Sequence, residues 1–288
     1  MNIKELHVVK TVIYTSESPL KHPRQLFSAM FQDIRSSWPL AWQLIVRDIS
    51  AQYRQTALGY LWAVLPTIIT SALWIFLNYS QIIVTDSGDI PYPVYALTGM
   101  TFWQLFVESL NAPLTEVNTN RNMLSKINFP KEALILSGIV QVLFSFLIKL
   151  VILAIMLVAF QVPLYWTALL VAFPVSVLLL LGTIIGVLLV PVGILYRDIQ
   201  QGLGVIISPL MFITPVVYTA PTEGILAQIM LYNPLTPLFE LIRDLLYVGI
   251  PKTLSETVVI FLVTLFFTLI GWIIYRLALP ILIERLDA

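Results

Sequence analysis

Few residues of this 288-residue chain could do chemistry within its long apolar stretches. Lys149 lies well inside one of them, where a lone ammonium group costs about 2.5–3.5 kcal/mol on insertion scales, so its side chain must face protein, water or a polar ligand. Ser137, Gln141 and Ser145 precede it at intervals of four and form a polar stripe along a helix. The stripe is either the lining of a hydrated pathway or a set of contacts between helices, with Glu108 as the partner of Lys149.

Motifs for catalysis and nucleotide binding are missing. The sequence has no GxxxxGKS/T loop to hold nucleotide phosphates and no GxSxG turn to present a serine nucleophile. Its histidines, His7 and His22, lie in the polar N-terminal region, and it has no cysteine, so we expect no metal site. Asp86 and Asp89 flank Gly88, where a turn is the simpler interpretation. We expect neither a catalytic site nor a cofactor in this chain, and any energy for transport must come from elsewhere.

The segments that carry these residues predict a membrane protein. Apolar residues make up 58% of the chain and charged residues 11%, against roughly 45–50% and about 25% in soluble domains. Several stretches exceed the roughly 18 apolar residues that cross a hydrocarbon core, and such continuous runs are unlike the alternating strands of a barrel. We predict an all-α protein with six transmembrane helices, at about 58–84, 94–114, 133–160, 166–195, 203–219 and 257–279.

The distribution of basic residues predicts the orientation. Thirteen of the sixteen Lys and Arg residues fall before the first helix, between the second and third, between the fourth and fifth, or at the C-terminal end. Only Arg243 and Lys252 lie on the other side. Because positive loops stay in the cytoplasm, both termini are expected there, in a multi-pass protein of the cytoplasmic (inner) membrane. The balance of 16 basic and 16 acidic residues gives no reason to propose a nucleic-acid partner.

The segment 35–56 differs from the spans. Trp38, Trp42, Ile45 and Ile49 fall on one helical face and polar residues on another, which predicts an amphipathic helix in the headgroup plane of the membrane. The alternative is a helix packed on the spans. We assign residues 1–34 to a cytoplasmic tail and 57–288 to the transmembrane domain.

Between the fifth and sixth spans, two apolar pieces at 225–231 and 235–246 are each too short to cross a membrane. Asn233 and Pro234 break the chain between them. These lengths predict a re-entrant helical hairpin at about 221–249 on the outer side, with an ordinary outer loop as the alternative. In the fourth span, Gly182 and Gly186 form a small-xxx-small pair that would let another helix approach closely.

Several short motifs occur in an order typical of one transporter family. They are LIVRDI (44–49), YRQTALGYLW (53–62), NMLSKINFPK (122–131), YRDI (196–199), SP (208–209), TPVVY (214–218), and YNP (232–234) followed by Arg243. From about residue 38 to the C-terminus the chain therefore resembles ABC-2 type permeases of the polysaccharide-export branch. Those that export O-antigen and related lipid-linked glycans are the most similar, with capsule and teichoic-acid exporters close behind.

The resemblance implies a homodimer, surrounded by membrane lipids, that works with two copies of a separate ABC ATPase. The ATPase would bind the ATP and magnesium, and the substrate of the transporter would be a lipid-linked glycan. A coupling helix at about 115–130 and the nearby interface helix would contact the ATPase, with candidate residues Arg47, Asp48, Arg54, Arg121, Lys126 and Phe129. Spans one and five of both protomers would line the channel. The candidates for its lining are Tyr60, Trp62, Trp74, Phe76, Lys149, Phe212 and Tyr218.

For each channel aromatic, anchoring at the membrane interface or facing lipid is the alternative, because Trp and Tyr collect at both membrane boundaries. The hairpin residues that match the family are Asn233, Pro234 and Arg243. Two other functions stay open for the chain as a whole. One is an ABC-2 exporter of a small lipid or drug, and the other is an ATP-independent flippase or a membrane-embedded glycan-processing enzyme.

Overall fold

The structure is a computed structural model that describes residues 23–54, 56–83, 85, 88–127, 129–196 and 198–287. These residues form helices joined by turns, with no strand among them, so the predicted all-α class is confirmed. The elements are α1 (Pro23–Arg54), η2 (Gly59–Ala63), α2 (Leu65–Tyr79), α3 (Tyr92–Thr119), α4 (Arg121–Lys126), α5 (Glu132–Ala159), η3 (Trp166–Val171), α6 (Ala172–Leu195), α7 (Asp198–Phe212), α8 (Ile225–Tyr232), α9 (Leu235–Arg243), η4 (Asp244–Val248) and α10 (Leu254–Asp287).

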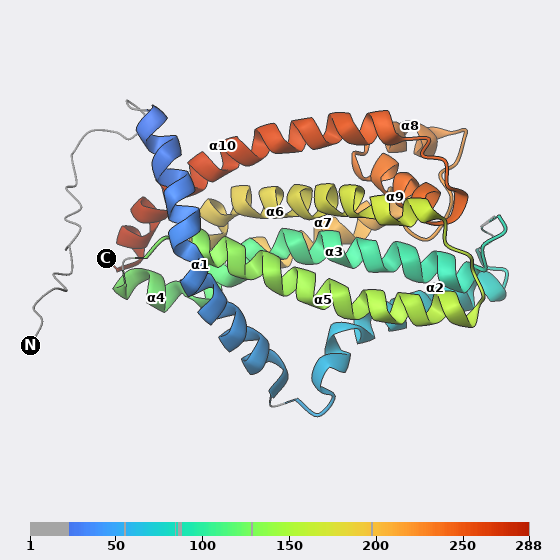
Figure 1. The fold of residues 1–288 in the computed structure, drawn as a ribbon, viewed down its shortest axis with the longest axis horizontal. Helices are drawn as coiled ribbons and strands as arrows, with labels where there is room; N and C mark the ends of the chain where they lie inside the picture. Colours follow the sequence, from blue (N-terminus) through green and yellow to red (C-terminus); the bar gives the residue numbers. More distant parts are fainter. Residues whose placement is uncertain are drawn as a thin grey trace, which may run out of the picture.

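The long helices α3, α5, α6 and α10 run lengthwise through the bundle (Figure 1). The short helix α4 and the C-terminal end of α10 lie at one end, and α8 and α9 lie at the opposite end. α1 crosses the bundle near the α4 end at a steep angle (Figure 1). The elements expected in the cytoplasm therefore lie near one end, and the predicted outer hairpin lies at the other.

Length and composition identify only some of these helices as membrane spans. Within the described residues, α5, the continuous helix Trp166–Leu195, and Leu254–Pro280 of α10 are each long and apolar enough to cross a bilayer. The segments Ile225–Tyr232 and Leu235–Val248 meet at 91° and count as a fourth span or as a re-entrant loop. α2 is apolar but has 15 residues, and α7 also has 15. The number of six spans thus stays a prediction.

α3 is the central helix, and it packs against α5, α6 and α2. Twenty of its 28 residues are buried. Gly182 and Gly186 of α6 lie against it, because a Cβ atom added at these glycines would lie 1.9 Å from Ser109 Oγ and 2.3 Å from the carbonyl oxygen of Leu110. The predicted close approach of a second helix is confirmed, and that helix is α3.

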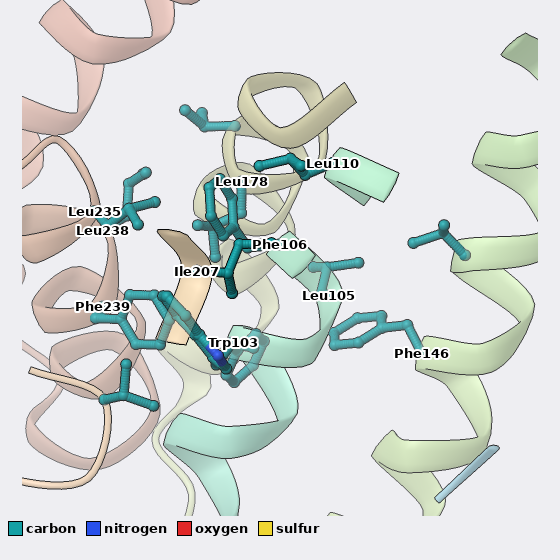
Figure 2. Packing of buried hydrophobic residues seen from close by; sticks show 14 of the residues in the cluster. Trp103, Leu105, Phe106, Leu110, Phe146, Leu178, Ile207, Leu235, Leu238 and Phe239 are labelled. Carbon is teal, nitrogen blue, oxygen red and sulfur yellow. The ribbon is translucent and has the colours of Figure 1, made fainter. Parts of the chain in front are cut away.

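The apolar core surrounds the middle of α3. Figure 2 shows Trp103 and Phe106 of α3 beside Phe239 of α9 and Ile207 of α7, with Phe146 of α5 on the other side of α3. The rings of Trp103 and Phe239 lie 6.4 Å apart, and Leu238 and Phe239 are almost completely buried. The bent pair α8–α9 therefore belongs to the core through α9 and is not a loop that rests on the surface.

Two predicted spans contain shorter helices than expected. The described part of the segment 58–84 contains the short 3-10 helix η2 and then α2, which ends at Tyr79. α2 has Pro66 in its first turn, a position where proline is favoured. The segment 203–219 leaves the helix after Phe212. Pro215 explains this end, because proline has no amide hydrogen to donate and disfavours a helical conformation at Thr214.

α1 begins at Pro23, inside the segment 1–34 that was predicted as a tail; residues 1–22 lie outside the described part. Ala41, Leu44 and Ile45 are at most 3% exposed and form the face that packs on the bundle. Trp38 and Trp42 are 52% and 55% exposed. α1 therefore packs on the bundle through a face that includes Ile45, which was predicted on the side of the tryptophans. Its position in the headgroup plane of the membrane stays a prediction.

Candidate coupling end, aromatic surface and outer hairpin

Arg47 links α1 to the junction of α3 and α4. Its guanidinium group donates to Asp48 Oδ1 at 2.6 Å and to Asn120 Oδ1 at 2.7 Å. The hydrogen bond to the Asp48 carboxylate raises the pKa of Arg47. Asn120, which lies between α3 and α4, donates in turn to the carbonyl oxygen of Glu116 at 2.9 Å. The two elements expected to contact an ATPase are thus joined directly by the Arg47–Asn120 contact.

Glu116 extends this network to α5. Its side chain is buried near the α4 end of α3, beyond the predicted second span, and Gln141 Nε2 donates to Glu116 Oε1 at 2.7 Å and to Ser137 Oγ at 3.1 Å. Burial raises the pKa of Glu116 to about 7; the charge of Asp48 acts in the same direction, while Gln141 and Arg47 oppose it. Part of the polar stripe on α5 therefore serves contacts between helices.

The other candidate coupling residues lie at the same end of the bundle. Arg121 and Lys126 are the first and last residues of α4; the Lys126 side chain is exposed and that of Arg121 is partly exposed. Phe129 is partly buried and packs against the apolar core. Arg54 is the last residue of α1, and its side chain lies outside the described part. The structure brings Arg47 and Asp48 together and leaves the basic residues of α4 accessible.

Lys149 is buried and forms an ion pair with a partly exposed glutamate. Its side chain is 1% exposed and contacts Glu108 of α3, and it also donates to Ser145 Oγ at 3.0 Å. Pairing with a carboxylate offsets the cost of placing an ammonium group at membrane depth. For Lys149, the structure supports the second interpretation of the polar stripe, which is contact between helices. Its side chain is packed against protein and does not face an open space.

The candidate channel aromatics lie mainly on η2, α2 and α7, and we call Tyr60, Trp62, Trp74, Phe76 and Phe212 the aromatic surface. Four of them are between 52% and 63% exposed, while Trp74 is partly buried. Trp74 lies beside Phe212, with ring centroids 5.9 Å apart, so α2 and α7 meet there. Tyr60 instead contacts a ring of α5, that of Phe144, at 6.0 Å. Exposure is expected equally for residues that face lipid and for residues that line a channel between protomers.

Tyr218 follows α7 and is partly buried. Its hydroxyl group donates to the carbonyl oxygen of Phe212, the last residue of α7. This contact satisfies one of the carbonyl groups that a helix end leaves without a partner in its own helix. Tyr218 therefore stabilises the end of the helix that carries part of the aromatic surface.

Asn233 of the hairpin holds the turn 213–218 from one side. Its amide donates at 2.8 Å both to the carbonyl oxygen of Ile213 and to Thr214 Oγ1, while its own Oδ1 accepts from the backbone N–H of Leu235 at 3.0 Å. Pro234 precedes α9 directly and has the conformation that starts a helix. The break between α8 and α9, predicted from these two residues, is confirmed.

Arg243 holds the same turn from the other side. Its guanidinium group donates to the carbonyl oxygens of Pro215 at 2.6 Å and Val216 at 2.5 Å, and it lies 4.0 Å from the centre of the Tyr95 ring. Gly99 allows this approach, since a Cβ atom there would lie 1.6 Å from the Val216 carbonyl oxygen. Asn233, Arg243 and Gly99 thus fix the turn after α7 to α3 and the hairpin.

Sequence reasoning missed three members of these networks. Glu116 and Asn120 are one helical turn apart at the end of α3, and Gly99 is a single glycine within a long helix. The spacing of Glu116 and Asn120 in the predicted coupling segment was a usable signal. Nothing in the local sequence shows that Gly99 faces a turn more than one hundred residues later, because that contact depends on the tertiary fold.

The geometry defines an all-helical integral membrane protein with polar junctions at one end and a bent hairpin at the other. The chain belongs to the ABC-2 type transporter family, whose sequence model matches residues 39–247. It is a multi-pass protein of the cytoplasmic membrane and a transporter permease, not itself an enzyme. Permeases of this family work with an ABC ATPase partner.

Individual relatives are similar over most of the chain. The O-antigen export system permease protein RfbA of Myxococcus xanthus is 26% identical over 210 residues, which cover 71% of this chain and 78% of the relative. The polysialic acid transport protein KpsM of Escherichia coli is 26% identical over 241 residues, or 81% and 91% of the two chains. RfbA of Klebsiella pneumoniae is 24% identical over 211 residues, or 70% and 78%. The resemblance to the polysaccharide-export branch is confirmed.

Proposed function

We propose that this chain is the membrane subunit of an ATP-driven exporter that moves an O-antigen-like, lipid-linked polysaccharide across the cytoplasmic membrane. The observation that carries the proposal is its similarity to permeases named for O-antigen export and polysialic acid transport, over 70% to 81% of its length. The surface glycan that is lost on depletion, whether O-antigen, capsule or teichoic acid, identifies the class that it carries.

In this proposal the six spans are the segments 58–84, 94–114, 133–160, 166–195, 203–219 and 257–279, which include parts or all of α2, α3, α5, α6, α7 and α10, and both termini lie in the cytoplasm. The excess of Lys and Arg on one side of the spans supports this orientation. The 91° bend between α8 and the following helix supports a hairpin that enters from the outer side and returns. Its burial through α9 provides the protein cover that a broken helix needs at membrane depth.

The ATPase partner binds ATP and Mg²⁺ and contacts α4 and the C-terminal part of α1. Arg121 and Lys126 would pair with acidic groups of the partner, and Phe129 would support α4 from the core side. A movement of α4 reaches α1 through the Arg47–Asn120 bond and α5 through Glu116 and Gln141. This network explains how a short cytoplasmic helix can move the spans as a unit.

The channel forms between two copies of the chain, where α2 and α7 of each protomer face one another. The aromatic surface then contacts sugar rings, and flat ring faces tolerate a sliding polymer better than a fixed set of hydrogen bonds does. A homodimer also gives the exposed aromatic side chains a function within the assembly. Tyr218, Asn233 and Arg243 support this wall from behind by fixing the end of α7.

Depletion of the protein tests the function. Cells without it should retain lipid-linked glycan in the cytoplasmic leaflet and lose it from the surface. Normal surface glycan after depletion would refute the proposal and favour the export of a small lipid or drug.

Charge reversal tests the coupling. Arg121→Glu together with Lys126→Glu should abolish export and co-purification with a P-loop ATPase, while the permease still accumulates in the membrane. Lys252→Glu, which changes an exposed lysine near the hairpin, is the matched control and should retain both. If the double variant keeps its ATPase, α4 is not the contact.

A further inference from the structure

A polar cleft of about 280 Å³ lies between η2, the start of α2, α3 and α5. It is separate from the contact of Trp74 with Phe212, because no residue of α7 lines it. Its lining residues are Gln52, Trp62, Ala63, Pro66, Thr67, Gln104, Glu108, Asn111, Ala112, Thr115, Glu116, Gly138, Gln141, Val142 and Ser145. Along α3 the cleft extends from Gln104 to Glu116, towards the α4 end of the bundle.

Two atoms of this lining have hydrogen-bonding capacity that the described residues do not satisfy. Thr67 is 2% exposed, and its hydroxyl group has no hydrogen-bond partner. Glu108 uses one carboxylate oxygen to pair with Lys149, and its buried Oε2 has no partner. An unsatisfied buried polar group is costly, so such groups in a cleft are expected to bind water or a polar ligand.

The chemistry of the lining restricts that ligand. Two carboxylates, Glu108 and Glu116, line the cleft together with side-chain amides and hydroxyl groups, and no Lys or Arg does. Such a lining offers phosphate groups no cationic partner, and it disfavours apolar molecules because they satisfy no hydrogen bond. It suits a neutral ligand with many hydroxyl groups, and Trp62, which is 52% exposed, adds an aromatic ring to the lining. The volume corresponds to roughly nine water molecules at about 30 Å³ each, which is room for a sugar ring.

We propose that this cleft binds a sugar unit of the transported glycan through its hydroxyl groups, on the cytoplasmic half of the permease, where it shares only Trp62 with the aromatic surface. The proposal rests on the proposed function, since it assumes that the cargo is a glycan. A sugar hydroxyl donates to Glu108 Oε2, the hydroxyl of Thr67 takes a partner, and the indole of Trp62 covers one ring face. The cleft is then a first binding site for the glycan before it enters the channel.

The chain has no cysteine, so a single introduced thiol reports on the cleft without further changes. Ala63→Cys places the thiol in the lining and keeps every polar group. In inside-out membrane vesicles, a membrane-impermeant maleimide should label this variant. Val151→Cys, on an exposed and apolar part of α5, should stay unlabelled. Absence of labelling at residue 63 would show that the cleft is closed to water and would overturn the proposal.

Occupancy is tested with vesicles from cells that make the lipid-linked glycan and from otherwise identical cells whose glycan synthesis is blocked. The glycan should slow the labelling of Ala63→Cys. Adding Thr67→Val should weaken this protection about tenfold in apparent affinity, the effect of one lost hydrogen bond. Ser71→Ala removes a second buried hydroxyl without a partner, on the same helix but outside the cleft, and should leave protection unchanged.

The outcomes separate the two proposals. Equal labelling with and without glycan, in a strain where depletion of the permease strands glycan inside, refutes the sugar site and leaves the export function intact. Normal surface glycan after depletion refutes the export function itself. A thermal midpoint of Thr67→Val at or above that of the unsubstituted chain excludes misfolding as the cause of weaker protection.

Discussion

Arg243→Ala should loosen the turn after α7 and destabilise the whole permease. The substitution removes two hydrogen bonds from a charged donor, worth about 1.5–3 kcal/mol each, and a cation–π contact worth about 1–2 kcal/mol. It also removes the cost of burying a guanidinium group, which is several kcal/mol. The net loss in free energy of unfolding should be about 2–4 kcal/mol, because the carbonyl groups of Pro215 and Val216 lose this donor in a buried turn.

The assay is thermal unfolding of the purified protein in detergent, followed by the loss of its monodisperse peak on size exclusion. At about 2–4 °C per kcal/mol, the midpoint should fall by about 4–16 °C. Arg243→Lys keeps the charge but loses the planar guanidinium group that reaches both carbonyl groups. Its midpoint should therefore lie between those of the unsubstituted chain and Arg243→Ala. Lys252→Ala is the control and should shift the midpoint little. A midpoint for Arg243→Ala that matches this control would refute the assigned role of the guanidinium group.

Three further predictions use the same assay. Gly99→Ala should lower the midpoint, because the added Cβ atom would meet the Val216 carbonyl group. Gly202→Ala has nothing within 4 Å of the added Cβ atom, so it should leave the midpoint unchanged or raise it, by a gain in stability of up to about 1 kcal/mol from helix propensity. Equal effects of the two substitutions would contradict the close approach at Gly99. Lys149→Met should destabilise, and adding Glu108→Leu should restore part of the loss, giving a coupling energy above about 1 kcal/mol; additive effects would exclude the ion pair. Because the folded pKa of Glu116, about 7, lies above its ordinary value of 4.5, its contribution to stability is lost as pH rises towards and through 7. The midpoint should therefore fall between pH 5.5 and 8, and Glu116→Gln should flatten this dependence; an unchanged slope would rule out Glu116 as its source.

Much of the fold follows from apolar length and from chain-breaking residues. The helix predicted at 133–160 is α5 at Glu132–Ala159, and the break at Asn233 and Pro234 separates α8 from α9. The ends of α2 and α7 were less accessible to prediction. The segment after Phe212 stays apolar across the turn, so hydropathy continues where the helix does not, and Pro215 was the signal that outweighed it.

Contacts of the candidate site could be predicted only where a local sequence pattern indicated them. Because of its depth, Lys149 was expected to face water, a polar ligand or protein, with Glu108 as its partner in the last case, and Glu108 is the partner that the structure shows. The contact between Arg47 and Asn120 joins residues 73 positions apart, and helical periodicity contains no information on which helices become neighbours. The family resemblance led us to expect that α1 and α4 contact the ATPase. Only the structure shows that the Arg47–Asn120 hydrogen bond connects α1 with the start of α4.

The polar character of α3 has a consequence for how the protein is made. This helix carries Gln104, Glu108 and Asn111, and unlike α5 it is not apolar enough to qualify as a span by itself. The ammonium group that neutralises Glu108 arrives only with α5, which is synthesised later. In the proposed six-span topology, a nascent chain that stops before α5 should therefore fail to integrate α3 stably.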